Sequence, residues 1–204
     1  MILSLENITR TIKGNKVLDD ISLKFNGGTS YAVSGKEGSG KTMLIRAMCG
    51  LIRLDGGKVS LDGKVLGKDI SVLPAGLMLE GASLYPDLSA VDNLKYLTSI
   101  NKKVELEDIF GSLFTVDLDP DDKRPVGTFS SGMKKRLSLA QAIFENPDIL
   151  LIDSIWNDGR TILKDIVEDY KKKGKIVIIT CRDPKEVEGL CDETIYIEEG
   201  KVKK

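Results

Sequence analysis

The spacing of apolar residues changes along the chain and separates a strand-rich first third from a mostly helical middle. Residues 21–25 alternate apolar and polar side chains, which predicts a strand with one solvent-exposed face. Residues 56–66 show the same alternation around Asp62 and Gly63, a pair typical of a hairpin turn. The short apolar run 31–34 predicts a further strand. The first third is therefore expected to be mainly β-structure.

The middle of the chain, about residues 85–146, predicts helices. Ser89 and Asp92 have the spacing of a capping box at the start of a helix. Residues 119–127 are polar and contain two prolines, which indicates a loop. A further helix is expected at about 133–145, where apolar residues recur with the helical period.

The last third alternates between strand and helix patterns. Residues 149–152 are all apolar, as in a strand that is covered on both faces. After it we expect a helix at 160–173, a strand at 176–179, a short helix at 186–190 and a final strand through Ile195 and Ile197. This alternation predicts an α/β fold with a mainly parallel central sheet and right-handed crossovers.

The composition fits a single globular domain and argues against several classes of function. At 204 residues, with 41% hydrophobic and 30% charged residues, the chain is expected to form one domain. No apolar run approaches the roughly 18 residues that cross a bilayer, so the chain itself is not expected to enter the membrane. A net charge of −1 gives no reason to expect a nucleic-acid partner. Three cysteines without metal or redox spacing predict reduced thiols in the cytosol, and the absence of histidine excludes histidine-based catalysis.

Residues 35–42 carry the clearest chemical motif, G-x-x-x-x-G-K-[ST], which is the phosphate-binding P-loop. The residues expected to line the phosphates are Gly35, Lys36, Glu37, Gly38, Ser39, Gly40, Lys41 and Thr42. Lys41 is expected to reach the β- and γ-phosphates, and the Thr42 hydroxyl to bind Mg²⁺. The loop lies between the strand at 31–34 and a helix expected at 41–52, which is the context that the motif requires. The apolar stripe of that helix would consist of Leu44, Ala47, Met48 and Leu51.

Two further places along the chain suit the same ligand. Asp153 follows the apolar strand at 149–152, and P-loop proteins place an acidic residue at such a strand end to orient Mg²⁺. Ser130, Ser131 and Gly132 lie at the start of the helix expected at 133–145. Free N–H groups and hydroxyls at a helix N-terminus favour anion binding.

With these motifs together, essentially the whole chain resembles the ATP-binding cassette (ABC) ATPases, whose signature reads L-S-G-G-Q where this sequence has F-S-S-G-M. The segments L-Y-P-D-L at 84–88 and S-x-G-M-K-K-R at 130–136 look most like cassettes of peptide-antibiotic export and immunity transporters of the bacitracin type. The resemblance implies one ABC ATPase domain over residues 1–204. Its nucleotide-binding core, with an antiparallel β subdomain, would cover 1–84 and 147–204, and a helical subdomain would cover 85–146.

The resemblance also implies partners and a location. In this family two cassettes dimerise head to tail, and each signature, here Ser130, Ser131 and Gly132, caps the ATP that the opposite P-loop holds. We therefore expect ATP with Mg²⁺ as the ligand and a second cassette as partner, in a homodimer or a heterodimer. Separate transmembrane permease domains would hold the pair at the cytoplasmic face of the membrane.

Several family positions hold other residues in this sequence. Ser154 stands where the family has the Glu that polarises the attacking water, and a neutral hydroxyl cannot serve as that base. Arg182 stands at the switch-histidine position, where it can attract the γ-phosphate but cannot cycle a proton. Glu80 stands at the Q-loop position, where a carboxylate can still approach Mg²⁺ beside Thr42 and Asp153.

Two other departures from the family pattern concern the dimer interface and the contact with the adenine ring of ATP. The segment 155–159 is several residues shorter than the D-loop of the family. Ile12 replaces the aromatic residue that stacks on adenine, which predicts ATP binding weaker by about tenfold or more, because such stacking contributes roughly 1–3 kcal/mol.

These observations predict an ATP-binding subunit of an ABC transporter, acting in export, with weak intrinsic hydrolysis. Slow hydrolysis through positioning and electrostatics alone is an alternative account of the same residues. Two other functions stay open on the sequence: a soluble ABC ATPase, and a regulatory subunit that uses ATP only to switch dimer contacts. The transported substrate is not encoded in this chain, because specificity in this family lies in the membrane domains.

Overall fold

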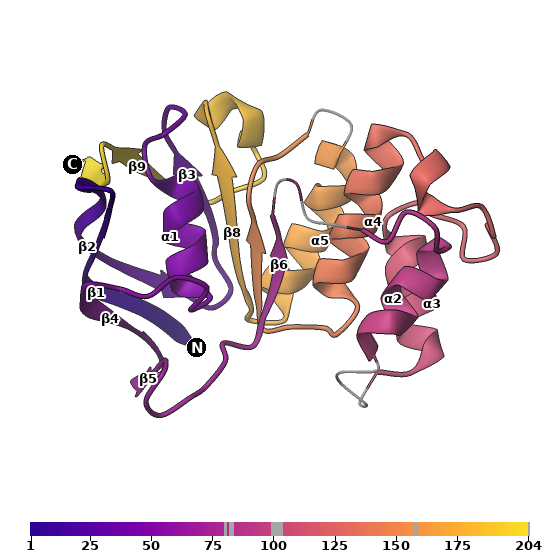
Figure 1. Ribbon diagram of the computed structural model, residues 1–204, viewed down its shortest axis with the longest axis horizontal. Helices are drawn as coiled ribbons and strands as arrows, with labels where there is room; N and C mark the ends of the chain where they lie inside the picture. The colour runs from indigo at the N-terminus through magenta and orange to yellow at the C-terminus, as the bar shows by residue number, and fades with distance from the viewer. Residues whose placement is uncertain (80, 82–83, 99–103, 157–158, 204) are drawn as a thin grey trace.

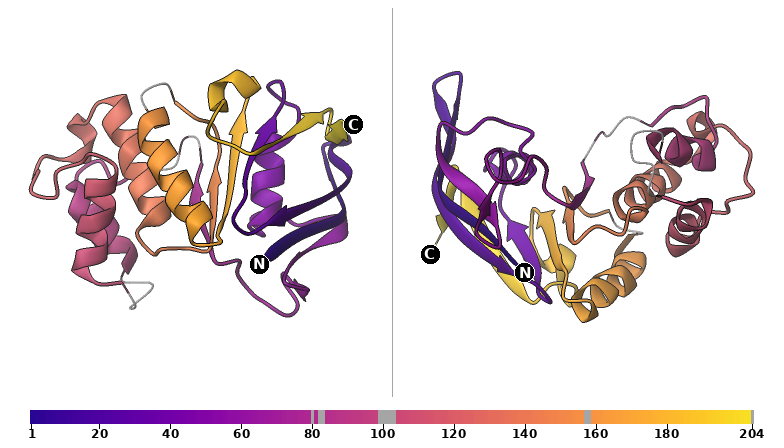
Figure 2. Two further views of the ribbon diagram at one scale, coloured as in Figure 1. Left: turned by 180° about the vertical axis from the view of Figure 1, so that it is seen from behind. Right: turned by 90° about the horizontal axis from the view of Figure 1, so that it is seen from below.

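Two β-sheets form the framework of the chain (Figure 1). The computed structural model describes residues 1–79, 81, 84–98, 104–156 and 159–203. The sheets meet at an angle with one helix between them, and the remaining helices lie beyond the second sheet (Figure 2).

The first sheet is antiparallel and has the strand order β2-β1-β4-β5. Its strands are β1 at Ile2–Ile12, β2 at Asn15–Asn26, β4 at Gly56–Leu61 and β5 at Lys64–Val65. The expected hairpin is confirmed, because Leu61 pairs with Lys64 across a two-residue turn. Asp62 and Gly63 both have positive φ in that turn, at 48° and 79°, as the favoured hairpin turn requires.

The second sheet has the order β10-β9-β3-β8-β7-β6 and is parallel except for β10, as the sequence predicted. Its strands are β3 at Ser30–Ser34, β6 at Ala75–Met78, β7 at Ile149–Ile152, β8 at Ile176–Cys181, β9 at Glu193–Glu198 and β10 at Lys201–Lys203. The sequence did not predict β10. The order places β8 between β3 and β7, so the carboxyl ends of three buried strands are neighbours.

Alternate residues of the parallel strands supply two separate hydrophobic cores. Ile149 and Leu151 face the core that holds α1 and the antiparallel sheet, whereas Leu150 and Ile152 face the core that holds the other helices. Side chains of a strand point to opposite faces in turn, so an all-apolar run is the expected sequence of a strand that is buried on both sides. All four residues are fully buried.

The helices are divided between the two faces of the parallel sheet. They are α1 at Lys41–Met48, α2 at Ala90–Thr98, α3 at Leu106–Thr115, α4 at Ser131–Ile143 and α5 at Arg160–Lys172, with 3₁₀ turns η1 at Val126–Thr128 and η3 at Pro184–Val187. Figure 2 shows α1 in the angle between the sheets and α5 against the opposite face of the parallel sheet. The predicted capping box at the start of α2 is confirmed in part: Ser89 Oγ accepts from the backbone N–H of Asp92, but the Asp92 carboxylate accepts from the Ser89 hydroxyl, where a full box uses the Ser89 backbone N–H.

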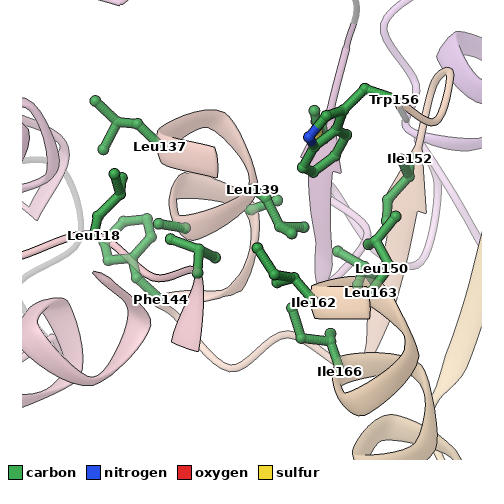
Figure 3. Packing of buried hydrophobic residues seen from close by; sticks show 14 of the residues in the cluster. Leu118, Leu137, Leu139, Phe144, Leu150, Ile152, Trp156, Ile162, Leu163 and Ile166 are labelled. Carbon is green, nitrogen blue, oxygen red and sulfur yellow. The ribbon is translucent and has the colours of Figure 1, made fainter. Parts of the chain in front are cut away.

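The second core joins α4 and α5 to the sheet (Figure 3). Leu137 and Leu139 of α4 and Ile166 of α5 belong to this cluster together with Ile152. Trp156 also lies in it and is 7% exposed, so the segment after β7 turns inward at this residue.

Three sequence-based expectations about helices are corrected. The first helix ends at Met48 instead of residue 52, because Gly50 adopts a positive φ of 71° that stops it. Leu51 is therefore 57% exposed and does not belong to the apolar stripe. The helix expected at 186–190 is the 3₁₀ turn η3, which begins earlier, with a proline in its first turn.

Across the described residues, no helix has both the length and the apolar character that a bilayer crossing needs.

Candidate nucleotide-binding site

The loop at residues 35–40 joins β3 to α1 and is shaped by close backbone contacts. A Cβ on Gly35 would lie 2.2 Å from the carbonyl oxygen of Ile197, and one on Gly40 would lie 2.5 Å from that of Val17. Gly40 also has a φ of 108°, which strains any residue that has a side chain. The backbone of neighbouring strands therefore lies close to both ends of the loop, where only glycine fits.

Lys41 points into this loop. Its Nζ donates to the carbonyl oxygens of Gly35, at 2.5 Å, and Lys36, at 2.8 Å, and lies 3.4 Å from Ser39 Oγ. Partial burial lowers the pKa of Lys41 from its ordinary value, while the carboxylate of Asp153 acts in the opposite direction. An ammonium group inside a loop of backbone amides offers a cation to an anionic ligand at the place that the motif predicts.

Asp153 lies at the carboxyl end of β7 and faces the start of α1. Its Oδ1 accepts from Thr42 Oγ1 at 3.2 Å, and the Asp153 side chain is almost fully buried. The two residues are 111 positions apart in the sequence. The structure therefore brings together the hydroxyl and the carboxylate that the sequence assigned to one Mg²⁺ ion.

These two oxygens suit Mg²⁺ in number and spacing. Adjacent ligands of an octahedral ion with bonds of about 2.0–2.1 Å are about 2.9 Å apart, which is close to the observed separation. The described residues contain no group of three or more carboxylate, thiol or imidazole side chains that would hold a metal alone. Mg²⁺ sites commonly use one or two protein ligands, which phosphate oxygens and water complete.

Thr180 is a site residue that the sequence analysis missed. It lies fully buried in β8, donates from Oγ1 to Asp153 Oδ1 at 2.9 Å and accepts from the backbone N–H of Ser154, also at 2.9 Å. One hydroxyl thus fixes both the carboxylate and the residue after it. A threonine in an otherwise apolar strand was the available signal, but the predicted strand ended one residue too early to include it.

We expect Thr180→Val to destabilise the fold by about 1–3 kcal/mol, because a buried carboxylate oxygen and a partly buried N–H lose their shared partner. The free energy of unfolding in denaturant measures the loss. Thr115→Val in α3 is the matched control, since its exposed hydroxyl bonds only to the carbonyl of Gly111. A Thr180 variant as stable as that control would contradict the role of Thr180.

Ser154 follows Asp153, at the position where the sequence analysis expected the catalytic base to be replaced. It has a φ of 74°, a conformation that is uncommon for a residue with a side chain, and the hydrogen bond to Thr180 holds its backbone there. Its side chain is exposed. Glu80, the other predicted carboxylate near the metal, lies outside the described residues.

Arg182 follows β8 and lies next to the loop. Its backbone is fixed at both ends, because its N–H donates to Glu186 Oε2 at 3.2 Å and its carbonyl accepts from Ser34 Oγ at 3.3 Å. A cavity of about 500 Å³ is lined by residues of the loop, by the turn that begins at Arg182 and by the hairpin of β9 and β10. The predicted switch position is therefore at the phosphate loop, 141 residues after Lys41 in the sequence (182 − 41).

The predicted signature residues start α4 on the helical side of the molecule. Ser130 is the N-cap and accepts from the backbone N–H of Met133 at 3.1 Å. Ser131 borders a second cavity, of about 350 Å³, together with Asp153 and Ser154. Ser130 and Ser131 are both exposed, so their hydroxyls are accessible from outside the chain.

The structure describes Ile12 in full but only part of the segment 155–159, the two remaining positions where the sequence departs from the family pattern. Ile12 ends β1 and is half-buried beside the hairpin turn to β2. Of the short segment 155–159, residues 157 and 158 lie outside the described residues. A Cβ on Gly159 would lie 2.2 Å from the indole of Trp156, so the buried tryptophan requires a glycine where α5 begins.

Known proteins resemble this chain over most of its length. The sequence profile described as ABC transporter matches residues 18–157. The chain is 42% identical to the uncharacterized ABC transporter ATP-binding protein YybJ of Bacillus subtilis (strain 168), covering 96% of this chain and 92% of that protein. It is 31% identical to the lantibiotic transport ATP-binding protein SrtF of Streptococcus pyogenes, covering 98% and 89%.

Solved structures show the same fold. The dimeric structure of MJ0796, a bacterial ABC transporter cassette, superimposes with a TM-score of 0.88 over 99% of this chain and 97% of that chain, at 20% identity. The post-hydrolysis state of the same cassette, bound to ADP and Pi, gives 0.87. The chain therefore belongs to the ABC transporter family and is an ATP-binding subunit of that family.

Proposed function

We propose that this subunit binds MgATP but hydrolyses it slowly. The observation that carries the proposal is the contrast between a complete phosphate loop with Asp153 and the hydroxyl of Ser154 in the place of the base. Loss of a general base typically lowers the rate of a reaction by about 10²–10⁴-fold. The chain also has no histidine that could replace it.

Within this site, each predicted residue has a proposed role. Lys41 and the backbone amides of residues 35–40 would hold the phosphates, and Thr42 with Asp153 would hold Mg²⁺, with Glu80 as a further candidate ligand. Arg182 would face the terminal phosphate. Mg²⁺, when bound, neutralises charge on the β- and γ-phosphates, which is its usual contribution to phosphoryl transfer.

We also propose a dimeric, membrane-associated assembly. Ser130, Ser131 and Gly132 would complete the nucleotide site of a second cassette, in a homodimer or heterodimer, and the exposure of Ser130 and Ser131 supports this role. Because SrtF is described as a lantibiotic transport protein, we propose export of a peptide antibiotic or a related compound through separate permease domains. The subunit would then lie at the cytoplasmic face, with residues 1–84 and 147–204 as nucleotide-binding core and 85–146 as helical subdomain.

Binding and turnover measured on one preparation test the function. We expect the purified chain to bind MgATP in calorimetric titration and to release phosphate slowly under saturating MgATP. Ser154→Glu should raise the rate without reaching that of an intact cassette, because Arg182 and the short segment 155–159 remain. Rapid steady-state hydrolysis by the wild-type chain would refute the proposal.

Asp153→Asn is the control for this measurement. If the slow phosphate release arises at this site, the substitution should abolish it, because the proposed metal ligand loses its charge. Residual release that survives Asp153→Asn would point to a contaminating ATPase. Absence of MgATP binding by the wild-type chain would overturn the proposed function itself.

A further inference from the structure

The phosphate loop carries an acidic side chain that pairs with the residue at the switch position. Glu37 Oε2 lies 3.3 Å from Arg182 Nη2. Among the described residues, this is the only ion pair that either side chain makes. Both side chains are mostly exposed, at 84% and 73%, so neither is held in place by packing.

The backbone that carries Arg182 is fixed, while its guanidinium group is free to change partner. The backbone of Arg182 is bonded to Glu186 and Ser34, as described above. The turn that follows is held by the Arg160 side chain, which donates to the carbonyl oxygens of Lys185, at 3.5 Å, and Glu188. The pair with Glu37 can therefore break by side-chain rotation, without any movement of the Arg182 backbone.

The negative charge of the Glu37 carboxylate repels the anionic phosphates that the loop is expected to bind. Lys41 already points inward to the loop carbonyls, so it does not neutralise Glu37. Arg182 does so instead. One guanidinium group thus has two possible partners, the Glu37 carboxylate and the terminal phosphate of a bound nucleotide, and phosphate is a strong bidentate partner for arginine.

We propose that Glu37 sets the preference of the site between ATP and ADP by competing with the terminal phosphate for Arg182. The inference rests on the proposed function, in which Arg182 faces that phosphate. ADP lacks the γ-phosphate and leaves the Glu37–Arg182 pair intact. ATP has to draw Arg182 away, so the pair lowers the affinity for ATP and leaves the affinity for ADP unchanged. Glu37 is in this sense a specificity-determining residue of the phosphate loop.

The test is calorimetric titration of the full chain with MgATP and with MgADP at constant ionic strength. Exposed ion pairs contribute little, so Glu37→Gln is expected to tighten MgATP binding by about two- to fivefold and to leave MgADP binding unchanged. Glu199→Gln is the matched control, because Glu199 borders the same cavity and its substitution removes the same charge. This control should change neither affinity.

A double-mutant cycle separates competition from simple repulsion between Glu37 and the phosphates. In an Arg182→Gln background the competition is absent, so Glu37→Gln should no longer tighten MgATP binding. A gain of the same size in both backgrounds, or an equal gain for ATP and ADP, would overturn the inference while leaving the proposed function intact. A wild-type chain that binds neither nucleotide would overturn both.

Discussion

Lys41→Met is expected to weaken MgATP binding by about 100-fold. A hydrogen bond to a charged group contributes about 1.5–3 kcal/mol, and Lys41 would make such bonds to two phosphate groups. A loss of about 3 kcal/mol corresponds to about two factors of ten in the dissociation constant. Calorimetric titration measures this directly, and it does not depend on how fast the chain hydrolyses ATP.

Lys36→Met provides the matched control for charge. Lys36 belongs to the same loop, but its side chain is exposed and only its carbonyl oxygen contacts the Lys41 ammonium. We expect its substitution to weaken binding by less than about threefold, as for other exposed charges. Equal losses in the two variants would show that the net charge of the loop matters and that the inward position of Lys41 does not.

Gly76→Ala is expected to destabilise the chain by about 3 kcal/mol or more. Gly76 lies in β6, and a Cβ there would come 1.7 Å from the carbonyl oxygen of Ala142 near the end of α4. The clashing carbonyl belongs to the backbone, so the added methyl can be accommodated only by moving the helix off the sheet, and overpacking of this kind typically costs about 1–3 kcal/mol or more. Thermal unfolding should show a melting temperature lower by about 6–12 °C.

Gly111→Ala is the opposite case and serves as the control. Gly111 lies in the exposed part of α3, and nothing lies within 4 Å of its added Cβ. Alanine has a higher helix propensity, so this variant should be more stable by up to about 1 kcal/mol. If Gly76→Ala unfolds like Gly111→Ala, the close contact between β6 and α4 is not present in solution.

Much of the fold follows from local sequence patterns. The all-apolar run at 149–152, the hairpin around Asp62 and the helix at Arg160–Lys172 were predicted with boundaries that differ from the structure by at most one residue. Each of these depends on a period or a turn preference that acts over a few residues. The expectation that α1 continues to residue 52 was wrong, because apolar residues continue past the glycine that ends the helix.

The candidate site could be predicted where its residues belong to recognisable sequence motifs. The loop at 35–42, Asp153 and the position of Arg182 were identified from the sequence, and the structure places them at neighbouring strand ends. Thr180 was not identified, because a single threonine in a strand has no distinctive spacing. The Glu37–Arg182 pair was also missed, since it joins two residues that are 145 positions apart (182 − 37).

The sequence by itself determined the phosphate loop, the strand end at Asp153 and the alternation of strands and helices, because each depends on residues that are close along the chain. It also predicted that Ser154 replaces the catalytic base. Only the tertiary structure decided that Thr180 holds Asp153 and that Glu37 pairs with Arg182. Both contacts depend on the order β3-β8-β7, which brings three distant carboxyl ends to one edge of the sheet. Strand order is set by how the helices cover the two faces of the sheet, and that choice is a property of the packed chain as a whole.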